Sequence, residues 1–309
     1  MTPASVDASF RRYFRVACAG RSYIVMDAPP DKEDNAPFIR VAGLLADAGL
    51  HVPEIIAADT AKGFLLLTDL GPNTYLQVLD STNCDALFRD AITALVRMQA
   101  HVESGSLPAY DESMLRRELA LFPDWYISRH LGQALTDELR NSLAAVETAL
   151  VQSALAQPVV FTHRDYMPRN LMVSTPNPGI LDFQDAVAGP ISYDPVCLFK
   201  DAFISWPEEQ VLDWTVRYWK AGRRAGLPLD SDFGRFYQGF EWMGVHRHLK
   251  VLGIFARIRY RDGKPAYLED APRFLKYLRQ VCVRYRELMP LANLLDFLES
   301  KGPQVGYTF

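Results

Sequence analysis

The sequence predicts an α+β fold in two lobes, with a small β-sheet lobe over residues 1–70 and a mostly helical lobe over residues 71–309. Two observations predict this fold. Short β-prone runs separated by turn residues dominate the first lobe, and apolar residues at helical spacing dominate the chain beyond Gly71-Pro72. A length of 309 residues, with 49% hydrophobic and 23% charged side chains, is enough for a sizeable core and excludes a disordered chain.

The first lobe is expected to contain two hairpins and one helix. Four β-prone runs fit strands, at residues 12–16, 22–26, 55–57 and 64–67. Gly20 and Gly63 lie between consecutive runs and predict the hairpin turns. Residues 36–48 carry apolar side chains at helical spacing, and Gly49 follows as a typical helix-terminating residue.

The second lobe reads as helices with one β-rich interruption. Amphipathic helices are expected at residues 85–101, 114–131 and 137–155. Residues 158–182 are β-rich and contain an evident turn at Pro176-Asn177-Pro178-Gly179, and helical periodicity then resumes to about residue 300. No internal repeat or low-complexity linker is seen, so the lobes are expected to join through a short connection near residues 68–72.

Charge and composition exclude several classes of protein. The formal net charge of −4 argues against a nucleic-acid binder. No apolar run is long enough to span a bilayer, and the N-terminus lacks a signal segment, so we expect no membrane partner. The four cysteines fit neither a zinc site nor a disulfide framework, and they predict reduced thiols in a cytoplasmic protein: Cys18, Cys84, Cys197 and Cys282.

One ordered set of polar residues carries the chemistry. His163 and Asp165 follow a short apolar run, Asn170 comes five positions after Asp165, and Asp182 ends another short run. Phosphoryl transfer needs a carboxylate to orient or deprotonate the attacking hydroxyl, and an amide oxygen and a second carboxylate to hold magnesium. The alternative interpretation is a set of turn formers and caps at strand ends.

With the stretch over residues 159–185, the chain resembles the aminoglycoside phosphotransferase/choline kinase superfamily, whose fold is protein-kinase-like. Within it, the chain is similar to cytoplasmic bacterial kinases that phosphorylate N-acetylmuramate and N-acetylglucosamine at the anomeric hydroxyl in cell-wall recycling. Three segments carry this closer similarity, at residues 7–16, 159–185 and 241–257. The resemblance implies ATP and Mg²⁺ as cofactors and a small-molecule sugar as the acceptor. It implies no obligate protein partner.

The resemblance also implies roles for individual residues. Asp165 matches the catalytic base, and His163 matches the residue that braces the catalytic loop. Asn170 and Asp182 match the magnesium ligands, and Arg169 is included among the catalytic candidates.

The nucleotide side departs from the kinase pattern. The chain has no Gly-rich phosphate loop, and the turn expected over the triphosphate starts at Ser9, a candidate hydrogen-bond donor to phosphate. Met26 stands near the position where a phosphate-pairing lysine is expected. Our hypothesis is that Arg12, or Arg11, replaces that lysine; the alternative is that both are exposed hairpin arginines.

The remaining candidates concern adenine and the acceptor. In this superfamily the segment that ends the small lobe offers backbone groups to adenine, which makes Thr68 and Leu70 candidates. Candidate acceptor residues are Asp201, Trp206, Trp242, His246 and Arg247. Residues 235–286 carry 12 basic and 4 acidic side chains. This charge fits a neutral or anionic sugar better than a polycation, although arginine-decorated solvent faces and core tryptophans explain the same residues.

Two other functions stay open at this point. A kinase of the same superfamily could act on another alcohol, such as an aminoglycoside or an amino alcohol. A nucleotide-binding pseudokinase would explain the missing lysine and glycines, but the base and both metal ligands are present.

Overall fold

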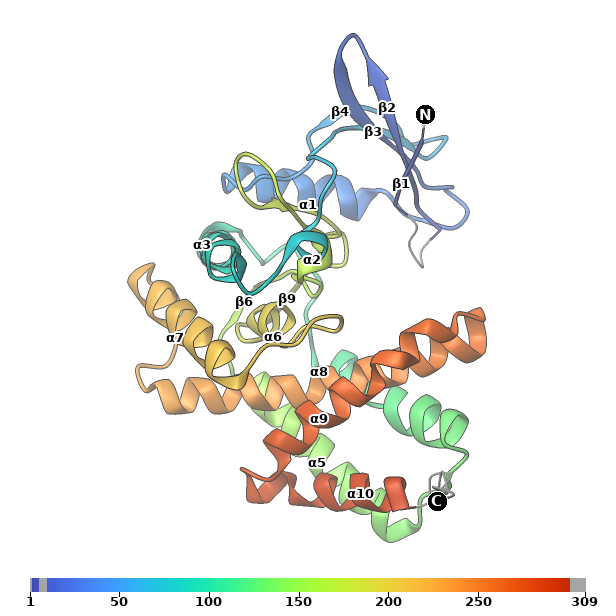
Figure 1. Cartoon of the computed structure of the whole chain (residues 1–309), viewed down its shortest axis with the longest axis vertical. Coiled ribbons are helices and arrows are strands. Elements are labelled where there is room, and N and C mark those ends of the chain that lie inside the picture. The colour runs from blue at the N-terminus through green and yellow to red at the C-terminus, as the bar shows by residue number, and fades with distance from the viewer. Residues whose placement is uncertain (1, 6–9, 301–309) are drawn as a thin grey trace. The chain divides into compact units, whose positions relative to one another are not determined.

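The computed structural model describes residues 2–5 and 10–300 (Figure 1). These residues form two compact units whose segments alternate along the chain. The first unit comprises the described residues of Met1–Pro108, Val160–Ala188 and Leu212–Pro228. The second comprises those of Ala109–Val159, Gly189–Val211 and Leu229–Phe309. The division of the chain into lobes at residue 70 stays a prediction.

The first unit contains an antiparallel sheet of five strands in the order β1-β2-β3-β5-β4. The strands are β1 (Thr2–Ser5), β2 (Arg12–Cys18), β3 (Arg21–Asp27), β4 (Ile55–Asp59) and β5 (Phe64–Thr68). The four predicted strands are therefore confirmed, and β1 is additional. Ala19 and Gly20 connect β2 to β3 with φ of 50° and 76°, the left-handed pair that suits a two-residue hairpin turn.

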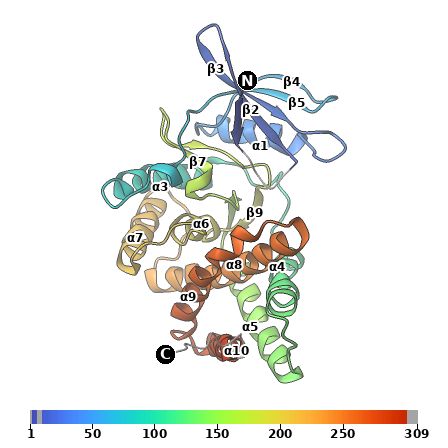
Figure 2. The same cartoon turned by 45° about the vertical axis from the view of Figure 1, so that its right-hand side comes forward.

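Helix α1 (Ala36–Asp47) lies along this sheet in Figures 1 and 2 and confirms the helix predicted over residues 36–48. Its apolar face is buried, as are the side chains on one face of the sheet. The buried residues are Phe38, Val41, Ala42 and Leu45 on α1 and Met26, Leu65 and Leu67 on the strands. The helix ends at Gly49, whose φ is 72° and whose N–H donates to Ala46 O at 2.8 Å.

The rest of the first unit supports the segment of the predicted chemistry. Helix α3 (Cys84–His101) confirms the helix predicted over residues 85–101, and the short helix α2 (Tyr75–Val78) precedes it. Helix α7 (Glu208–Arg224) places Trp214 against Phe88 with ring centroids 4.2 Å apart, and the Trp214 indole donates to Asp85 at 2.7 Å. Two short strands, β7 (Leu171–Met172) and β8 (Gly179–Ile180), pair antiparallel.

The second unit is helical. Its elements are α4 (Glu112–Leu119), η1 (Phe122–His130), α5 (Asp137–Leu155), α6 (Tyr193–Phe199), α8 (Phe233–Asp262), η3 (Pro265–Asp270), α9 (Ala271–Cys282), η4 (Arg286–Leu288) and α10 (Met289–Ser300). Helix α8 is the central element, because α5, α6, α9 and η1 all pack against it. Helix α5 confirms the helix predicted over residues 137–155.

The single helix predicted over residues 114–131 is wrong. The chain forms α4 to Leu119 and then the π-helical segment η1 from Phe122. Pro123 explains the change, because proline has no N–H to donate and its ring clashes with the carbonyl four residues earlier. The apolar spacing continues through Phe122, Tyr126 and Ile127, all buried, and this spacing hid the break.

Two further properties of the described residues bear on the predictions. All four cysteines are free, and three of them are buried. None of the described helices combines the length and apolar character that crossing a membrane requires.

The tight packing of α8 against the chain before η1 gives a prediction for stability. A Cβ atom on Gly253 would lie 2.4–2.5 Å from atoms of Leu121, two of which belong to the backbone. We expect Gly253→Ala to lower the free energy of unfolding by about 1–3 kcal/mol, measured by urea denaturation. Gly43→Ala in α1 is the matched control, because its Cβ would meet nothing within 4 Å. Equal effects of the two substitutions would contradict this packing argument.

Candidate active site

The loop that follows β6 (Val159–Thr162) begins with a buried, neutral histidine. Burial lowers the pKa of His163 to about 4. Its Nδ1 atom accepts the backbone N–H of Asp165 at 3.3 Å, and its ring contacts Tyr166 edge to face at 5.7 Å. Tyr166 in turn donates its hydroxyl to Ala91 O in α3 at 2.9 Å. The loop is thus anchored on both sides of Asp165, and the bracing role of His163 stays a prediction.

Asn170 joins the two carboxylate-bearing positions. It ends the short turn η2 (Pro168–Asn170), and its side chain is largely buried. Its amide nitrogen donates to the backbone oxygen of Asp165 at 2.9 Å and to Asp182 Oδ2 at 3.2 Å. The structure therefore brings together Asp165, Asn170 and Asp182. Arg169 is half-buried in the same turn.

Asp182 occupies an unusual backbone conformation. Its φ of 62° lies in the left-handed region, which costs on the order of 1–3 kcal/mol for a residue with a side chain and is typical of functional sites. Besides the bond from Asn170, the carboxylate accepts Gln184 Nε2 at 2.7 Å on Oδ1. Arg164, on the preceding loop, also has a left-handed φ of 74° and donates to Asp185 O at 3.4 Å.

The donor set fits a hard divalent cation held jointly with phosphate. The two bonds of Asn170 use its amide nitrogen, so they do not engage its amide oxygen. Oxygen ligands from one or two side chains, completed by water and phosphate, are what Mg²⁺ takes in phosphoryl-transfer sites. Within residues 2–5 and 10–300, no cluster of three His, Cys, Asp or Glu residues could hold a metal by itself.

Of the phosphate-loop candidates, Ser9 lies outside the described residues. Arg12 pairs with Asp27, and its side chain is 63% exposed. Arg11 is largely buried; it forms an ion pair with Glu33 at 3.1 Å and donates to Asp34 O at 3.2 Å.

The register of the sheet separates the two arginines. Tyr13 pairs with Met26 and Arg12 pairs with Asp27. Residues paired across an antiparallel ladder share one face of the sheet, and successive residues alternate between faces. Arg12 and Met26 therefore point to opposite faces, so Arg12 is poorly placed to supply the charge missing at Met26.

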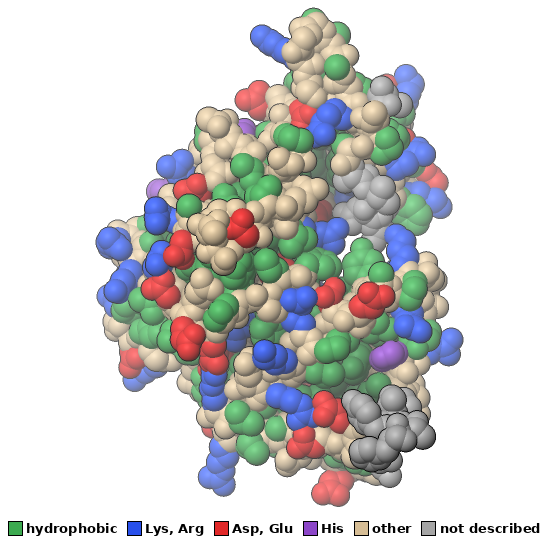
Figure 3. All heavy atoms as spheres, in the orientation of Figure 1, with side chains coloured by type: hydrophobic (Ala, Val, Ile, Leu, Met, Phe, Trp, Pro, Cys, Tyr) green, Lys and Arg blue, Asp and Glu red, His purple; other side chains and the backbone are tan. Residues whose placement is uncertain are grey.

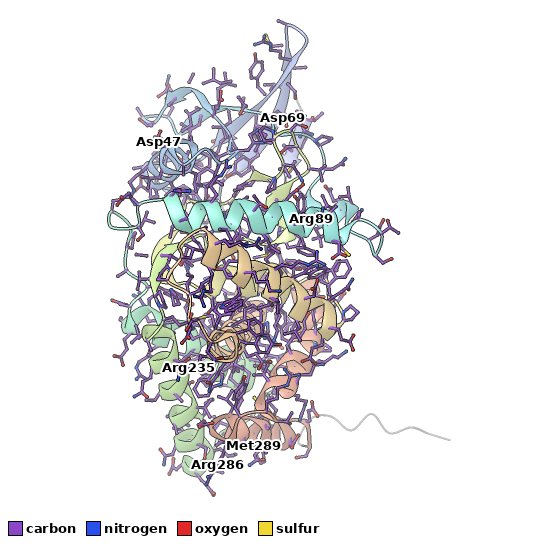
Figure 4. All side chains as sticks on the ribbon, turned by 90° about the vertical axis from the view of Figure 1, so that its left-hand side faces the viewer. Asp47, Asp69, Arg89, Arg235, Arg286 and Met289 are labelled. Carbon is purple, nitrogen blue, oxygen red and sulfur yellow. The ribbon has the colours of Figure 1, made fainter. Side chains whose placement is uncertain are left out.

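Residues 68–71, which begin at the last residue of β5, are called the hinge segment. The Thr68 backbone N–H donates to Glu54 O at 3.0 Å, and its hydroxyl accepts Glu54 N at 2.9 Å. Leu70 is largely buried. This segment also contains Asp69, labelled in Figure 4, whose carboxylate binds Arg15 on β2.

The acceptor candidates all belong to the second unit, and two of them interact. Asp201 is fully buried, and its Oδ1 accepts the backbone N–H groups of Phe203 at 2.6 Å and Ile204 at 3.0 Å. Burial raises the pKa of the Asp201 carboxyl, although these hydrogen bonds and the charge of Arg247 act against the rise. Among the described residues, no donor reaches the buried Oδ2 atom.

The other acceptor candidates have surroundings that favour packing. His246 is fully buried, its Nε2 lies 3.2 Å from Leu115 O, and burial lowers its pKa to about 4. Trp242 is 8% exposed and meets Tyr285 edge to face at 5.8 Å. Trp206 is half-buried.

Five of the twelve basic side chains of residues 235–286 form ion pairs with acidic partners. These ion pairs join Lys250 to Glu118, Arg261 to Asp262, Arg273 to Asp270, Arg279 to Asp296 and Glu299, and Arg284 to Glu208 and Glu241. In Figure 3 the visible Lys and Arg side chains are interspersed with Asp and Glu side chains. This arrangement favours solvated faces over a single anion-attracting patch.

Sequence reasoning missed Gln184, which donates to Asp182 and whose own Oε1 is buried, with no donor reaching it from the part of the chain that the structure describes. Its position two residues after Asp182 was the available signal. It also missed the pairing of Arg15 with Asp69, which are 54 positions apart.

Comparison with known proteins identifies the family of the chain. A model of the phosphotransferase enzyme family matches residues 1–229. The chain is 58% identical over 298 residues to an N-acetylmuramate/N-acetylglucosamine kinase of Pseudomonas aeruginosa, covering 96% of this chain and 88% of the relative. It is 48% identical over 315 residues to a protein of the same name from Neisseria meningitidis serogroup B, covering 100% of this chain and 94% of the relative.

Solved structures share the fold at low sequence identity. A choline kinase from Cryptosporidium parvum superposes with a TM-score of 0.63 at 13% identity, covering 95% of this chain and 93% of that one. An ADP-bound aminoglycoside phosphotransferase superposes with a TM-score of 0.55 at 16% identity, covering 89% of this chain and 92% of that one. These similarities confirm the predicted α+β, protein-kinase-like fold. Together with the family match and the two relatives, they establish that the chain is a phosphotransferase and belongs to the phosphotransferase enzyme family.

Proposed function

We propose that the chain is a cytoplasmic sugar kinase that uses ATP and Mg²⁺ to phosphorylate N-acetylmuramate and N-acetylglucosamine at the anomeric hydroxyl, giving the sugar 1-phosphate for peptidoglycan recycling. The observation that carries this proposal is the joined set of Asp165, Asn170 and Asp182 in a chain 58% identical to a kinase named for these two sugars. The same set argues against a pseudokinase, because it supplies both a base and metal ligands.

In this proposal Asp165 orients the acceptor hydroxyl for in-line attack on the γ-phosphoryl group. Its backbone is fixed by His163 and Asn170, while the residue itself is only half-buried and can reach a ligand. The anomeric hydroxyl is more acidic than an ordinary alcohol, so the carboxylate acts mainly by positioning and accepts the proton as the phosphate bond forms. No covalent phosphoenzyme is needed.

Asn170 and Asp182 are the proposed magnesium ligands. When bound, the metal supplies positive charge that offsets the charge of the transferred phosphoryl group. Gln184 holds one oxygen of Asp182 and Asn170 contacts the other, so the carboxylate is oriented before any ligand arrives. This preorganisation is the reason to assign a positioning role to Gln184.

For the nucleotide, we assign adenine recognition to backbone groups of Thr68 and Leu70 and phosphate contact to Arg11. For Thr68 the group assigned is the backbone oxygen, because its N–H is bonded to Glu54 O. Arg11 is preferred over Arg12 because Arg12 points to the sheet face opposite Met26. The buried ion pair with Glu33 keeps the Arg11 guanidinium ordered next to the start of β2.

For the acceptor, we assign Asp201 and Arg247. A fully buried carboxylate oxygen with no donor from the described residues is costly unless a ligand donates to it, and sugar hydroxyl or amide groups are such donors. The guanidinium of Arg247 interacts electrostatically with this carboxylate and suits the lactyl carboxylate of N-acetylmuramate.

An ADP-release assay over a panel of acceptors tests the proposed function. We expect the two N-acetylated amino sugars to give the highest kcat/KM, above choline, ethanolamine and aminoglycosides. A preference for an amino alcohol or an aminoglycoside would assign the chain to another branch of the family, and ATP binding without turnover on any acceptor would indicate a pseudokinase.

Replacing the proposed base should remove turnover and spare nucleotide binding. We expect Asp165→Asn to lower kcat by at least about 100-fold, because the side chain keeps its shape but no longer accepts a proton. Calorimetric titration with Mg²⁺-ADP should give a Kd within about twofold of wild type, since Asp165 is not a nucleotide ligand in this account. Glu112→Gln, at a half-exposed carboxylate on α4, is the control. Near-normal turnover of Asp165→Asn would refute the assignment.

The two candidate arginines can be separated by kinetics. We expect Arg11→Ala to raise the KM for ATP about tenfold, the size expected for one charge-assisted hydrogen bond to phosphate. Arg12→Ala should raise it less, because its side chain faces away from Met26. A larger rise for Arg12→Ala would transfer the role to Arg12.

The acceptor assignment predicts a selective loss of sugar binding. Asp201→Asn should raise the KM for both sugars about tenfold, because one buried acceptor of hydrogen bonds becomes a donor, while the KM for ATP stays within about twofold. Thermal unfolding of the variant checks that the buried site still folds. A KM for sugar equal to that of wild type would contradict the role of Asp201.

A further inference from the structure

A network of charged side chains fixes the hinge segment to the middle of the sheet. Arg15, on β2, binds the carboxylate of Asp69 with both ends of its guanidinium fork: Nε donates to Oδ2 at 2.6 Å and Nη2 donates to Oδ1 at 3.1 Å. Nη2 also donates to the backbone oxygen of Gly71 at 2.8 Å. One side chain therefore holds two residues of the hinge segment. All three residues belong to the first unit.

The Asp69 carboxylate has four donors in total. Ser22 on β3 donates its hydroxyl to Oδ2 at 2.5 Å, and Gly71 N–H donates to Oδ1 at 3.1 Å. Burial acts to raise the pKa of Asp69, but the bonds from Arg15, Ser22 and Gly71 hold it below its ordinary value. The Asp69 side chain is only 7% exposed, so this ion pair differs from exposed ion pairs, which contribute little to stability.

The segment held in this way has little other support on one side. Gly71 has a φ of 115°, a conformation that residues with side chains rarely adopt. A cavity of about 410 Å³ borders the segment; Asp69, Leu70 and Gly71 line it, together with His51 and residues 173–175. On the side of this space, the hydrogen bonds of the Asp69 carboxylate with Arg15, Ser22 and Gly71, and that of Arg15 with Gly71 O, hold the backbone.

The network also lies on the face of the sheet that carries Met26. Arg15 pairs with Ile24, and Tyr13 pairs with Met26, so Arg15 and Met26 share a face. This is the face on which a phosphate-pairing lysine is expected. The guanidinium therefore joins the strand that follows the expected phosphate turn to the segment assigned to adenine.

We propose that Arg15 and Asp69 form a clamp that sets the backbone of residues 68–71 in the geometry that binds the nucleotide base, which makes both of them positioning residues for nucleotide affinity. The proposal rests on the proposed function only in that Thr68 and Leu70 present backbone groups to adenine. A clamp of this kind acts on nucleotide binding and leaves the phosphoryl-transfer groups in the loop after β6 unchanged.

The test measures Mg²⁺-ADP binding by calorimetry in the absence of acceptor, together with steady-state kinetics. Arg15→Met and Asp69→Asn should each raise the Kd for ADP and the KM for ATP about tenfold, because each removes the same charge-assisted fork. In the double variant, the Kd for ADP and the KM for ATP should exceed those of either single variant by no more than about twofold, since both substitutions remove the same interaction. The kcat and the KM for sugar should stay within about twofold of wild type.

Arg15→Lys keeps the charge but loses the fork, so it should fall between wild type and Arg15→Met; it also serves as the test if Arg15→Met does not fold. Lys62→Met is the matched control, because Lys62 and Asp59 form an exposed ion pair in the hairpin of β4 and β5 in the same sheet. An unchanged Kd for ADP in folded Arg15 variants, or a fall in kcat as large as the rise in KM, would overturn the clamp. Wild-type protein that binds ADP but phosphorylates neither sugar would contradict the proposed function and leave the clamp measurement intact.

Discussion

The proposed chemistry of this protein depends on a single amide side chain, that of Asn170. It donates to the backbone of Asp165 and to the carboxylate of Asp182, and so fixes the spacing between the proposed base and the proposed metal ligand. Both carboxylates lie on loops that leave short strands, where the backbone alone would not hold them. A buried amide with satisfied donors is rigid, which is what an in-line transfer between two fixed oxygens requires.

The surrounding loop supports this amide through unusual local features. His163 is buried and neutral, so it accepts the Asp165 N–H instead of carrying a charge. Asp182 adopts a left-handed backbone, and Gln184 donates a hydrogen bond to its Oδ1 atom. Strain of this kind persists only where neighbouring contacts outweigh it, and here those contacts converge on the proposed metal site. On the nucleotide side, the proposed clamp of Arg15 and Asp69 acts in a similar way, because charged hydrogen bonds hold the backbone of residues 68–71 next to a cavity.

Local patterns predicted most of the fold, and the limits have physical causes. The hairpin turn at Gly20 and the helix end at Gly49 could be predicted because glycine favours the left-handed backbone conformation that both positions adopt. The break at Pro123 was masked because apolar spacing continued through η1. The ordered set from His163 to Asp182 predicted the candidate site. The contact of Gln184 depends on the backbone of Asp182, and that of Arg15 with Asp69 on a pairing 54 residues apart in sequence. Neither leaves a pattern within one segment.

The most direct test of the central claim is the phosphorus NMR spectrum of the product formed from each sugar. A phosphate on the anomeric oxygen couples to the anomeric proton, so the account predicts for both sugars a phosphorus doublet that a proton–phosphorus correlation spectrum connects to that proton. Coupling to another ring proton, or to the two protons of a methylene group, would contradict the anomeric assignment. The absence of any sugar phosphate from wild-type protein with ATP and Mg²⁺ would contradict the account as a whole.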